Sequence, residues 1–192
     1  MPAKITENPH YLSQQLITYI GNKRALLSFI ERGLNKVKKK LNQTHLDIFD
    51  VFSGSGVVAR FLKQHSKLLI TNDLEKYSFI INQCYLANQK DLNLDLLKEM
   101  YDHLKAKLVP AQFYQGILSQ NYAPQDDQAI QKGERVFYTQ YNAQYIDSAR
   151  QHISLLDPSY QPFFLAPLLS QASIHANTAG VFKGFYKCKK TG

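Results

Sequence analysis

The chain has 192 residues, 44% of them hydrophobic, which is enough for one packed domain of ordinary size or for part of a larger protein. It contains no run of about 18 apolar residues that would cross a membrane, and its polar start, MPAKITENPHYLSQQ, does not resemble a signal peptide. The formal net charge of +8 favours a polyanionic partner such as nucleic acid, with a solvated basic surface as the plainer alternative.

Cysteine and histidine usage excludes several kinds of site. Cys84 and Cys188 lie far apart without a partner motif, and the six histidines are scattered without the spacing of metal ligands. We therefore expect reduced thiols in a cytoplasmic protein, and no metal site.

The first residues, 1 to about 18, are expected to form an irregular arm. Gly21-Asn22 is a turn signal, and Asn22 is a plausible helix cap. From Arg24 to about residue 41, apolar residues recur at helical spacing along one face, which predicts an amphipathic helix. The lysines late in this helix suit its negative end and also offer contacts to a polyanion: Lys36, Lys38, Lys39 and Lys40.

A strand, a glycine turn and a helix follow in close succession. The apolar run over 46–52 suggests a strand buried on both faces, with Asp50 near its end. Ser53-Gly54-Ser55-Gly56 then turns the chain into a helix that begins at residue 57. Glycines let backbone approach a ligand closely, and a helix start offers unpaired N–H groups, so this order suits nucleotide binding. No lysine follows the last glycine, so the phosphate-binding P-loop pattern is absent.

A second buried strand is expected over 67–72, with Asp73 directly after it and a helix from about residue 75 to 89. The interval from Asp50 to Asp73 suits one βαβ unit, and an acid at this position is the usual partner of a ribose hydroxyl pair. The pattern therefore predicts nucleoside binding. The plainer role for Asp73 is to cap the helix that follows.

The rest of the chain reads as mainly helical. Helices are expected over about 93–108, 134–156 and 163–176, the last with a kink at Pro167, and a long loop over 110–133. The tail is rich in glycine, aromatic residues and lysine: Lys183, Lys187, Lys189 and Lys190.

Three ordered segments resemble motifs of the Dam-type family of S-adenosylmethionine-dependent DNA adenine methyltransferases. Residues 19–23 are similar to its Tyr-x-Gly-x-Lys motif, residues 50–56 to its (Asp/Glu)-x-Phe-x-Gly-x-Gly cofactor loop, and Asn72-Asp73, leading into a helix with Asn82, to its ribose-binding strand end. The resemblance implies that S-adenosylmethionine is held by Tyr19, Gly21, Lys23, Asp50, Phe52, Ser53, Gly54, Gly56 and Asp73.

The catalytic Asp-Pro-Pro-(Tyr/Phe) motif of that family is not found in this sequence. Asp157-Pro158-Ser159-Tyr160 differs by one residue, but we disfavour Asp157, Pro158 and Tyr160 as catalytic residues. They precede residues 177–187, which resemble the segment the family places ahead of target recognition, whereas the family motif follows it. No apolar strand leads into them either, so we expect the N-terminal part of a methyltransferase, without its catalytic strand.

The resulting prediction is an α/β fold: an incomplete Rossmann-like methyltransferase sheet in a single domain. Residues 1–92 would form the cofactor-binding part, 93–176 a helical insertion, and 177–192 the start of target recognition. The expected partner is double-stranded DNA within a restriction-modification system, and a complementing C-terminal segment is a further candidate. Two alternatives remain. One is a non-catalytic nucleic-acid-binding protein with a degenerate cofactor pocket; the other is a dinucleotide-dependent oxidoreductase, with Ala59 at the third glycine position of its fingerprint.

Overall fold

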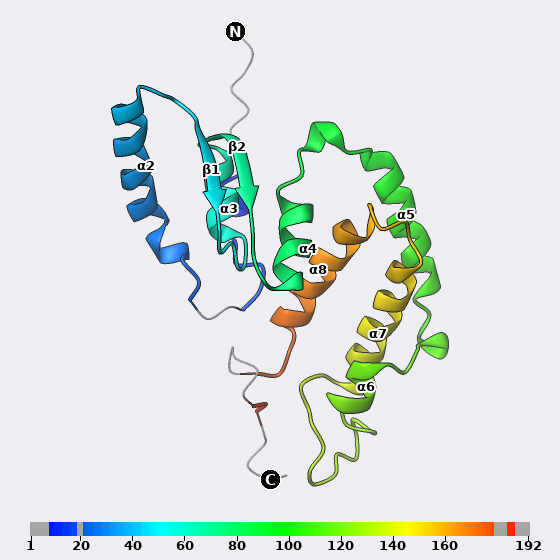
Figure 1. Ribbon diagram of the computed structural model, residues 1–192. Helices are drawn as coiled ribbons and strands as arrows, with labels where there is room; N and C mark the ends of the chain where they lie inside the picture. Colours follow the sequence, from blue (N-terminus) through cyan, green and yellow to red (C-terminus); the bar gives the residue numbers. More distant parts are fainter. Residues whose placement is uncertain (1–7, 19–20, 179–183, 187–192) are drawn as a thin grey trace. The chain divides into compact units, whose positions relative to one another are not determined.

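The computed structural model describes residues 8–18, 21–178 and 184–186, and the chain divides into two compact units, 1–88 and 89–192 (Figure 1). No helix in the described part of the chain is long and apolar enough to span a bilayer. The first unit contains α1 (Pro9–Ser13), η1 (Arg24–Leu26), α2 (Leu27–Leu41), β1 (Leu46–Asp50), α3 (Val57–Lys63), β2 (Ser66–Thr71) and α4 (Lys76–Tyr85). The second contains η2 (Gln89–Asp91), α5 (Leu94–Lys107), η3 (Pro110–Gln112), α6 (Ile117–Asn121), α7 (Gln140–Ser154) and α8 (Gln161–Ile174).

The centre of the first unit is a βαβ arrangement. β1 and β2 pair in parallel, and α3 connects them and packs against both strands. The register pairs Asp50 with Thr71, so the carboxyl ends of both strands reach the same edge of the sheet. The mixed α/β class expected from the sequence is therefore confirmed.

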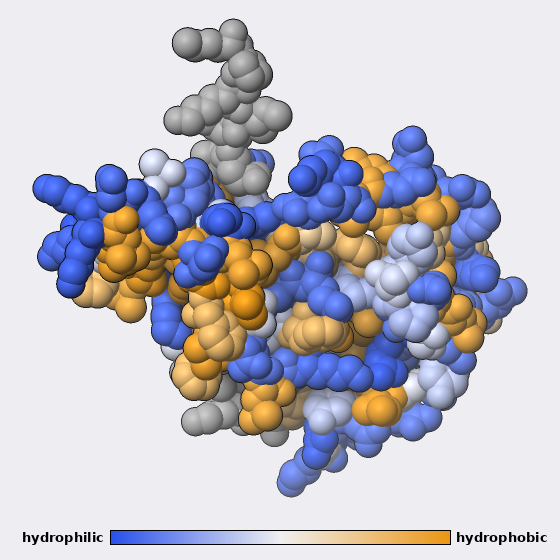
Figure 2. Space-filling view, turned by 45° about the horizontal axis from the view of Figure 1, so that its top comes forward, coloured by the Kyte–Doolittle hydropathy of each residue, from blue (hydrophilic) through white to orange (hydrophobic). Residues whose placement is uncertain are grey.

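The expectation that these strands are buried on both faces is wrong. Successive strand residues point to opposite faces, and only the face that carries Ile48 and Leu69 is partly covered. On the other face Phe49 is 57% exposed and Ile70 is 50% exposed. Hydrophobic side chains of the first unit consequently lie on its surface (Figure 2).

The amphipathic helix expected after residue 24 is confirmed as η1 followed by α2. Its end is set by Asn42, which adopts a left-handed conformation with φ +51° and donates its N–H back into the helix. The apolar face is not covered, since no residue of α2 is buried and Phe29 is 65% exposed. Lys38 reaches across to the segment before β2, where its Nζ lies 3.0 Å from His65 Nδ1.

The N-terminal arm (residues 8–18) was expected to be irregular, but part of it is helical. Residues 9–13 form the short helix α1, because the Asn8 side chain accepts a hydrogen bond from the His10 N–H and Pro9 suits a first helical position. Leu16, further along the arm, is buried. The arm is thus packed against the unit.

The second unit begins its long helix later than the sequence pattern suggested. α7 starts at Gln140, because the Thr139 hydroxyl caps it by accepting from the Asn142 N–H at 3.1 Å. Residues 134–139 are not helical; there Phe137 and Tyr138 enter a core with Ala123 and Ala143.

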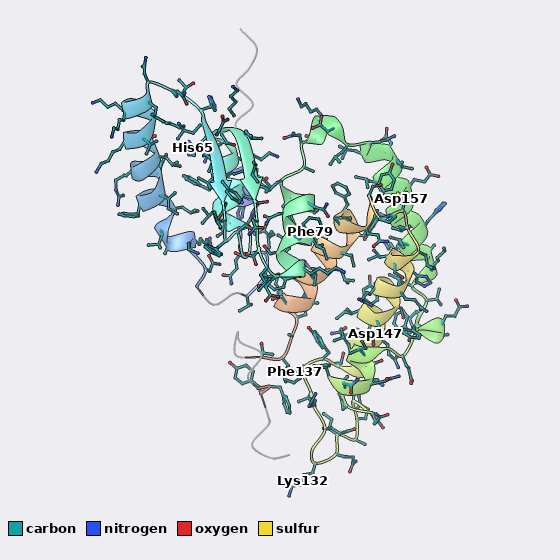
Figure 3. The ribbon with its side chains drawn as sticks, in the orientation of Figure 1. His65, Phe79, Lys132, Phe137, Asp147 and Asp157 are labelled. Carbon is teal, nitrogen blue, oxygen red and sulfur yellow. The ribbon has the colours of Figure 1, made fainter. Side chains whose placement is uncertain are left out.

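The loop expected over 110–133 contains two short helices, η3 and α6. Asp147 of α7 organises α6 by accepting from Gly116 N (3.0 Å), Leu118 N (3.1 Å), Ser119 N (2.8 Å) and Ser119 Oγ (2.8 Å). Figure 3 labels Asp147 where α6 and α7 pack together. A cap supplied from so far along the chain gives no local sequence signal.

Candidate functional site at the glycine loop

The glycine loop (residues 53–56) joins β1 to α3 at the carboxyl edge of the sheet. Gly54 and Gly56 have positive φ values of 51° and 72°, and the Gly56 N–H donates to the Ser53 carbonyl at 2.8 Å. A Cβ at Gly56 would lie 2.8 Å from Asn82 Oδ1 of α4. Both the backbone angle and the lack of space therefore require glycine at position 56.

A buried network of hydrogen-bonded polar side chains supports the glycine loop. The Ser53 hydroxyl donates to the Asn72 carbonyl at 3.1 Å and accepts from Asn82 Nδ2 at 2.8 Å. Ser53 Oγ also lies 3.2 Å from the Ser78 hydroxyl. Ser78 and Asn82 stand four positions apart on one face of α4, a spacing that would have indicated the pair, although sequence reasoning missed Ser78.

Asp73 bridges the loop and the start of α4. Its Oδ2 accepts from the Gly54 N–H at 2.7 Å, and its Oδ1 accepts from the Glu75 N–H at 3.0 Å. Asp73 thus accepts from the N–H of the residue that precedes α4, and not from an N–H inside the helix. Each carboxylate oxygen has a second lone pair, so the group can still accept from a ligand hydroxyl.

Two buried polar atoms of the site have no hydrogen-bond partner among the residues that the structure describes: Asp50 Oδ2 and Asn82 Oδ1. Burial raises the pKa of the Asp50 carboxyl above its ordinary value and nearby Asp73 adds to the rise, while Lys23 and the Phe52 backbone N–H act in the opposite direction. A positively charged ligand group beside Oδ2 would stabilise the carboxylate.

The other residues implied by the resemblance lie as follows. Gly21 occupies a turn with φ +82°. Lys23 is exposed just before η1, yet close enough to lower the Asp50 pKa. Phe52 is 79% exposed beside the loop. Tyr19 lies outside the described residues.

Asp157, Pro158 and Tyr160 lie in the turn between α7 and α8 of the second unit (Figure 3). Asp157 Oδ1 accepts from the Ser159 N–H at 2.8 Å and from its hydroxyl at 2.5 Å, and these bonds lower the pKa of the exposed Asp157 carboxyl. Helix α7, not a strand, leads into this turn. Its hydrogen bonds are those of an ordinary helix connection.

Metal-ligating side chains form no cluster in the part of the chain that the structure describes. No three His, Cys, Asp or Glu residues there are arranged to hold a metal ion. Cys84 is a half-buried free thiol whose pKa burial raises to about 11. Cys188 and the tail lysines lie beyond the described residues. Of residues 177–187, only 177–178 and 184–186 are described, with an isolated bridge between Thr178 and Phe185.

Comparisons with known proteins bear on this geometry. A family model described as D12 class N6 adenine-specific DNA methyltransferase matches residues 19–191. The chain is similar to the type II methyltransferase M.NlaIII of Neisseria lactamica, at 30% identity over 179 residues that cover 89% of this chain and 49% of the relative. It is 29% identical over 182 residues to the type II methyltransferase M.CviAII of Paramecium bursaria Chlorella virus 1, covering 91% of this chain and 51% of that protein.

A third relative, the modification methylase LlaI of Lactococcus lactis subsp. lactis, is 27% identical over 180 residues, which cover 88% of this chain and 27% of the relative. No solved structure matches the chain. The chain thus spans about half the length of the first two relatives.

Proposed function

The chain belongs to the family of D12 class N6 adenine-specific DNA methyltransferases, and we propose that its first unit binds S-adenosylmethionine for such an enzyme. The observation that carries this proposal is the buried Asp50 Oδ2, which has no donor among the described residues, next to a loop that only glycine can form. Family membership also decides against the dinucleotide-dependent oxidoreductase.

The residues at this edge of the sheet fit the chemical groups of S-adenosylmethionine. Its methionine end carries an ammonium group and a sulfonium, and both are positive groups that a desolvated carboxylate such as Asp50 would attract. Its ribose has two hydroxyl donors, which suit the remaining lone pairs of Asp73. We assign the methionine end to Asp50 and the glycine loop, and the ribose to Asp73.

The remaining assignments rest on the family resemblance together with position. Lys23 and Gly21 would shape the wall near Asp50, with Tyr19 beside them. Phe52 offers an exposed apolar ring next to the loop, where a bound nucleoside would cover it. We assign no catalytic role to Asp157, Pro158 or Tyr160.

In the whole enzyme we propose transfer of the methyl group to the exocyclic amino nitrogen of adenine. The base would be flipped out of the duplex, since that nitrogen is not accessible inside the stack. The protein then contributes mainly by holding the two reactants in line. The bound S-adenosylmethionine supplies the activated methyl group, while residues of the first unit bind and orient the cofactor.

We further propose that β1 and β2 belong to a larger Rossmann-like parallel sheet, with residues 93–176 as a helical insertion and 177–192 as the start of target recognition. Double-stranded DNA is the proposed partner, contacted in part by the α2 lysines, in a restriction-modification setting. A C-terminal segment carrying the Asp-Pro-Pro-(Tyr/Phe) motif would complete the sheet and the base-binding half. The exposed face with Phe49 and Ile70 is the surface such a segment would cover.

Isothermal titration of the 192-residue protein with S-adenosylmethionine tests the cofactor assignment. Binding is expected, and Asp73→Asn and Asp73→Ala should weaken it by about 1–3 kcal/mol, the cost of losing a charged hydrogen-bond partner. Asp47→Asn is the control, because Asp47 is an exposed aspartate near the beginning of β1, away from the carboxyl ends of the strands. No binding by the folded protein would favour the non-catalytic nucleic-acid-binding alternative instead.

A further inference from the structure

Arg60 is the most deeply buried charged side chain near the site and has no part in the cofactor assignment. It belongs to α3 and is only 1% exposed. Among the described residues no carboxylate pairs with it. Burial lowers the pKa of its guanidinium from the ordinary value, although an arginine remains charged at neutral pH. A buried charge without an ion-pair partner needs other compensation.

Backbone carbonyl groups from two separate segments provide that compensation. Arg60 Nη1 donates to the Tyr11 carbonyl at 2.6 Å, and Nη2 donates to the Gln14 carbonyl at 2.5 Å. Its Nε donates at 3.4 Å to the carbonyl of Gly56, four residues earlier, at the start of the same helix. One planar side chain therefore connects the N-terminal arm with the last residue of the glycine loop.

Two tyrosine rings complete the surroundings of the guanidinium. The Arg60 Cζ lies 5.7 Å from the Tyr11 ring centroid and 5.9 Å from that of Tyr85, which are cation–π distances. The Tyr11 hydroxyl also donates to the Tyr85 carbonyl, so the arm is attached to the end of α4 as well. These contacts hold residues 11–14 against α3 and α4.

The arm leads directly to the segment that carries Lys23. That lysine is exposed, but it lies close enough to Asp50 to favour the charged form of the carboxyl. The Lys23 carbonyl accepts from the Leu26 N–H at 2.9 Å, while its side chain makes no cap bond at η1. Only residues 19–22 separate Lys23 from the arm, so an anchored arm limits how far the covalently connected lysine can move.

We propose that Arg60 is a positioning residue that fixes the N-terminal arm to the glycine loop and thereby sets the place of Lys23 beside the cofactor. This inference rests on the proposed function, since it deepens the account of the same site. A lysine cannot replace the arginine, because a single ammonium does not reproduce a planar fork that bonds two carbonyl groups and stacks between rings.

The first measurement is made without cofactor. Amide hydrogen exchange of Leu12 and Gln14, whose N–H groups donate to Asn8 and His10 carbonyls at 3.3 and 2.7 Å, reports whether α1 stays docked. Arg60→Lys should speed this exchange at least about tenfold, while Arg150→Lys, the same change at an exposed position of the second unit, should leave it unchanged. Unaltered exchange in folded Arg60→Lys would overturn the anchoring.

The second measurement distinguishes positioning from a merely structural role. Arg60→Lys should weaken S-adenosylmethionine binding about tenfold in the wild-type background. In a Lys23→Met background the same substitution should weaken binding less than about twofold, because Arg60 would act on the cofactor through Lys23. Equal losses in both backgrounds would show that Arg60 does not act through Lys23. If Arg60→Lys does not fold, Tyr11→Leu loosens the same arm from its other side and should reproduce both results.

The two measurements test the proposed function and the anchoring by Arg60 separately. A wild-type protein that does not bind S-adenosylmethionine would overturn the proposed function and the effect on Lys23. The exchange of the arm amides would still support or overturn the anchoring by Arg60.

Discussion

At the scale of single residues, Asp50 combines a strained electrostatic position with a place in the candidate site. Burial is the largest cause of its raised pKa, and Lys23 only partly opposes that effect. The charged form therefore costs stability in the unliganded fold, and a cationic ligand would recover part of that cost. Such tension between stability and binding is typical of functional residues.

Asp50→Asn is accordingly expected to stabilise the fold and weaken cofactor binding. A raised carboxyl pKa favours the folded state below the ordinary pKa of the acid, and this contribution is lost as the pH rises through the folded value. The gain in the free energy of unfolding that Asp50→Asn brings should thus be present near neutral pH and vanish in acid. Urea unfolding at several pH values, with Asp47→Asn as control, measures it; a gain that persists in acid would point to another cause.

Gly56→Ala should destabilise the first unit by about 1–2 kcal/mol or more, since alanine at φ +72° is strained and its Cβ would meet Asn82 Oδ1. Gly33→Ala in the middle of α2 is the matched comparison, because nothing lies within 4 Å of its added Cβ. That substitution should stabilise by roughly 0.5–1 kcal/mol through helix propensity. Thermal unfolding of both variants is the measurement, and equal effects would contradict the steric account.

At the scale of elements, the Asp147 carboxylate of α7 accepts several hydrogen bonds from the start of α6. Asp147→Ala would leave the N–H groups of Gly116, Leu118 and Ser119 without their acceptor. We expect a loss of about 2–4 kcal/mol in the stability of the second unit, since buried donors would remain unsatisfied.

Urea unfolding together with amide exchange of α6 checks this prediction. Asp126→Ala is a suitable control, because Asp126 is an exposed turn residue that caps only the Gln128 N–H at 2.8 Å. Retained protection of the Ser119 amide in Asp147→Ala would show that α6 is held by other contacts.

At the scale of the whole molecule, apolar surface is left uncovered on the sheet and on α2. Phe29, Phe49 and Ile70 are each at least half exposed, which is unusual for a stable monomer surface. We expect weak self-association that rises with concentration in analytical ultracentrifugation. A double variant, Phe49→Lys with Ile70→Lys, should reduce it, since charge on an exposed strand opposes edge and face pairing. Sedimentation independent of concentration would oppose this expectation.

The 192-residue chain is expected not to methylate DNA by itself. Methyl transfer requires both reactants at near-attack distance, an arrangement that is worth about 7–11 kcal/mol. The sequence contains no Asp-Pro-Pro-(Tyr/Phe) motif to hold the base. The assay is tritiated-methyl transfer to mixed-sequence duplex DNA. Turnover above background would reinstate Asp157, Pro158 and Tyr160 as the catalytic site, and a Tyr160→Ala variant would then test them directly.

Weak DNA binding should persist in the same protein, because its net charge is +8 and α2 carries four lysines near its end. Such binding releases counterions and should fall steeply between low and physiological salt. Fluorescence anisotropy at several salt concentrations measures the slope. A salt-independent affinity would argue against phosphate contacts.

Elements with strong local signals followed from the sequence alone. The apolar run and glycine turn predicted β1 and the loop, and the helical spacing after residue 24 predicted α2, because periodicity and turn chemistry act over a few residues. The start of α5 also has a local signal, because the Asn93 side chain caps it by accepting from the Leu96 N–H at 3.1 Å. The order of Asp50, the loop and Asp73 likewise located the candidate site.

Only the tertiary structure decided which of these residues are buried and what they contact. Three features of the structure join segments that are distant in sequence. They are the contacts of buried Arg60, the support of Ser53 by Ser78 and Asn82, and the capping of α6 by Asp147. The late start of α7 has both kinds of cause: the Thr139 cap is local, whereas the packing of Phe137 and Tyr138 into the core is tertiary. Burial and hydrogen-bond partners are properties of the packed chain, and no local pattern encodes them.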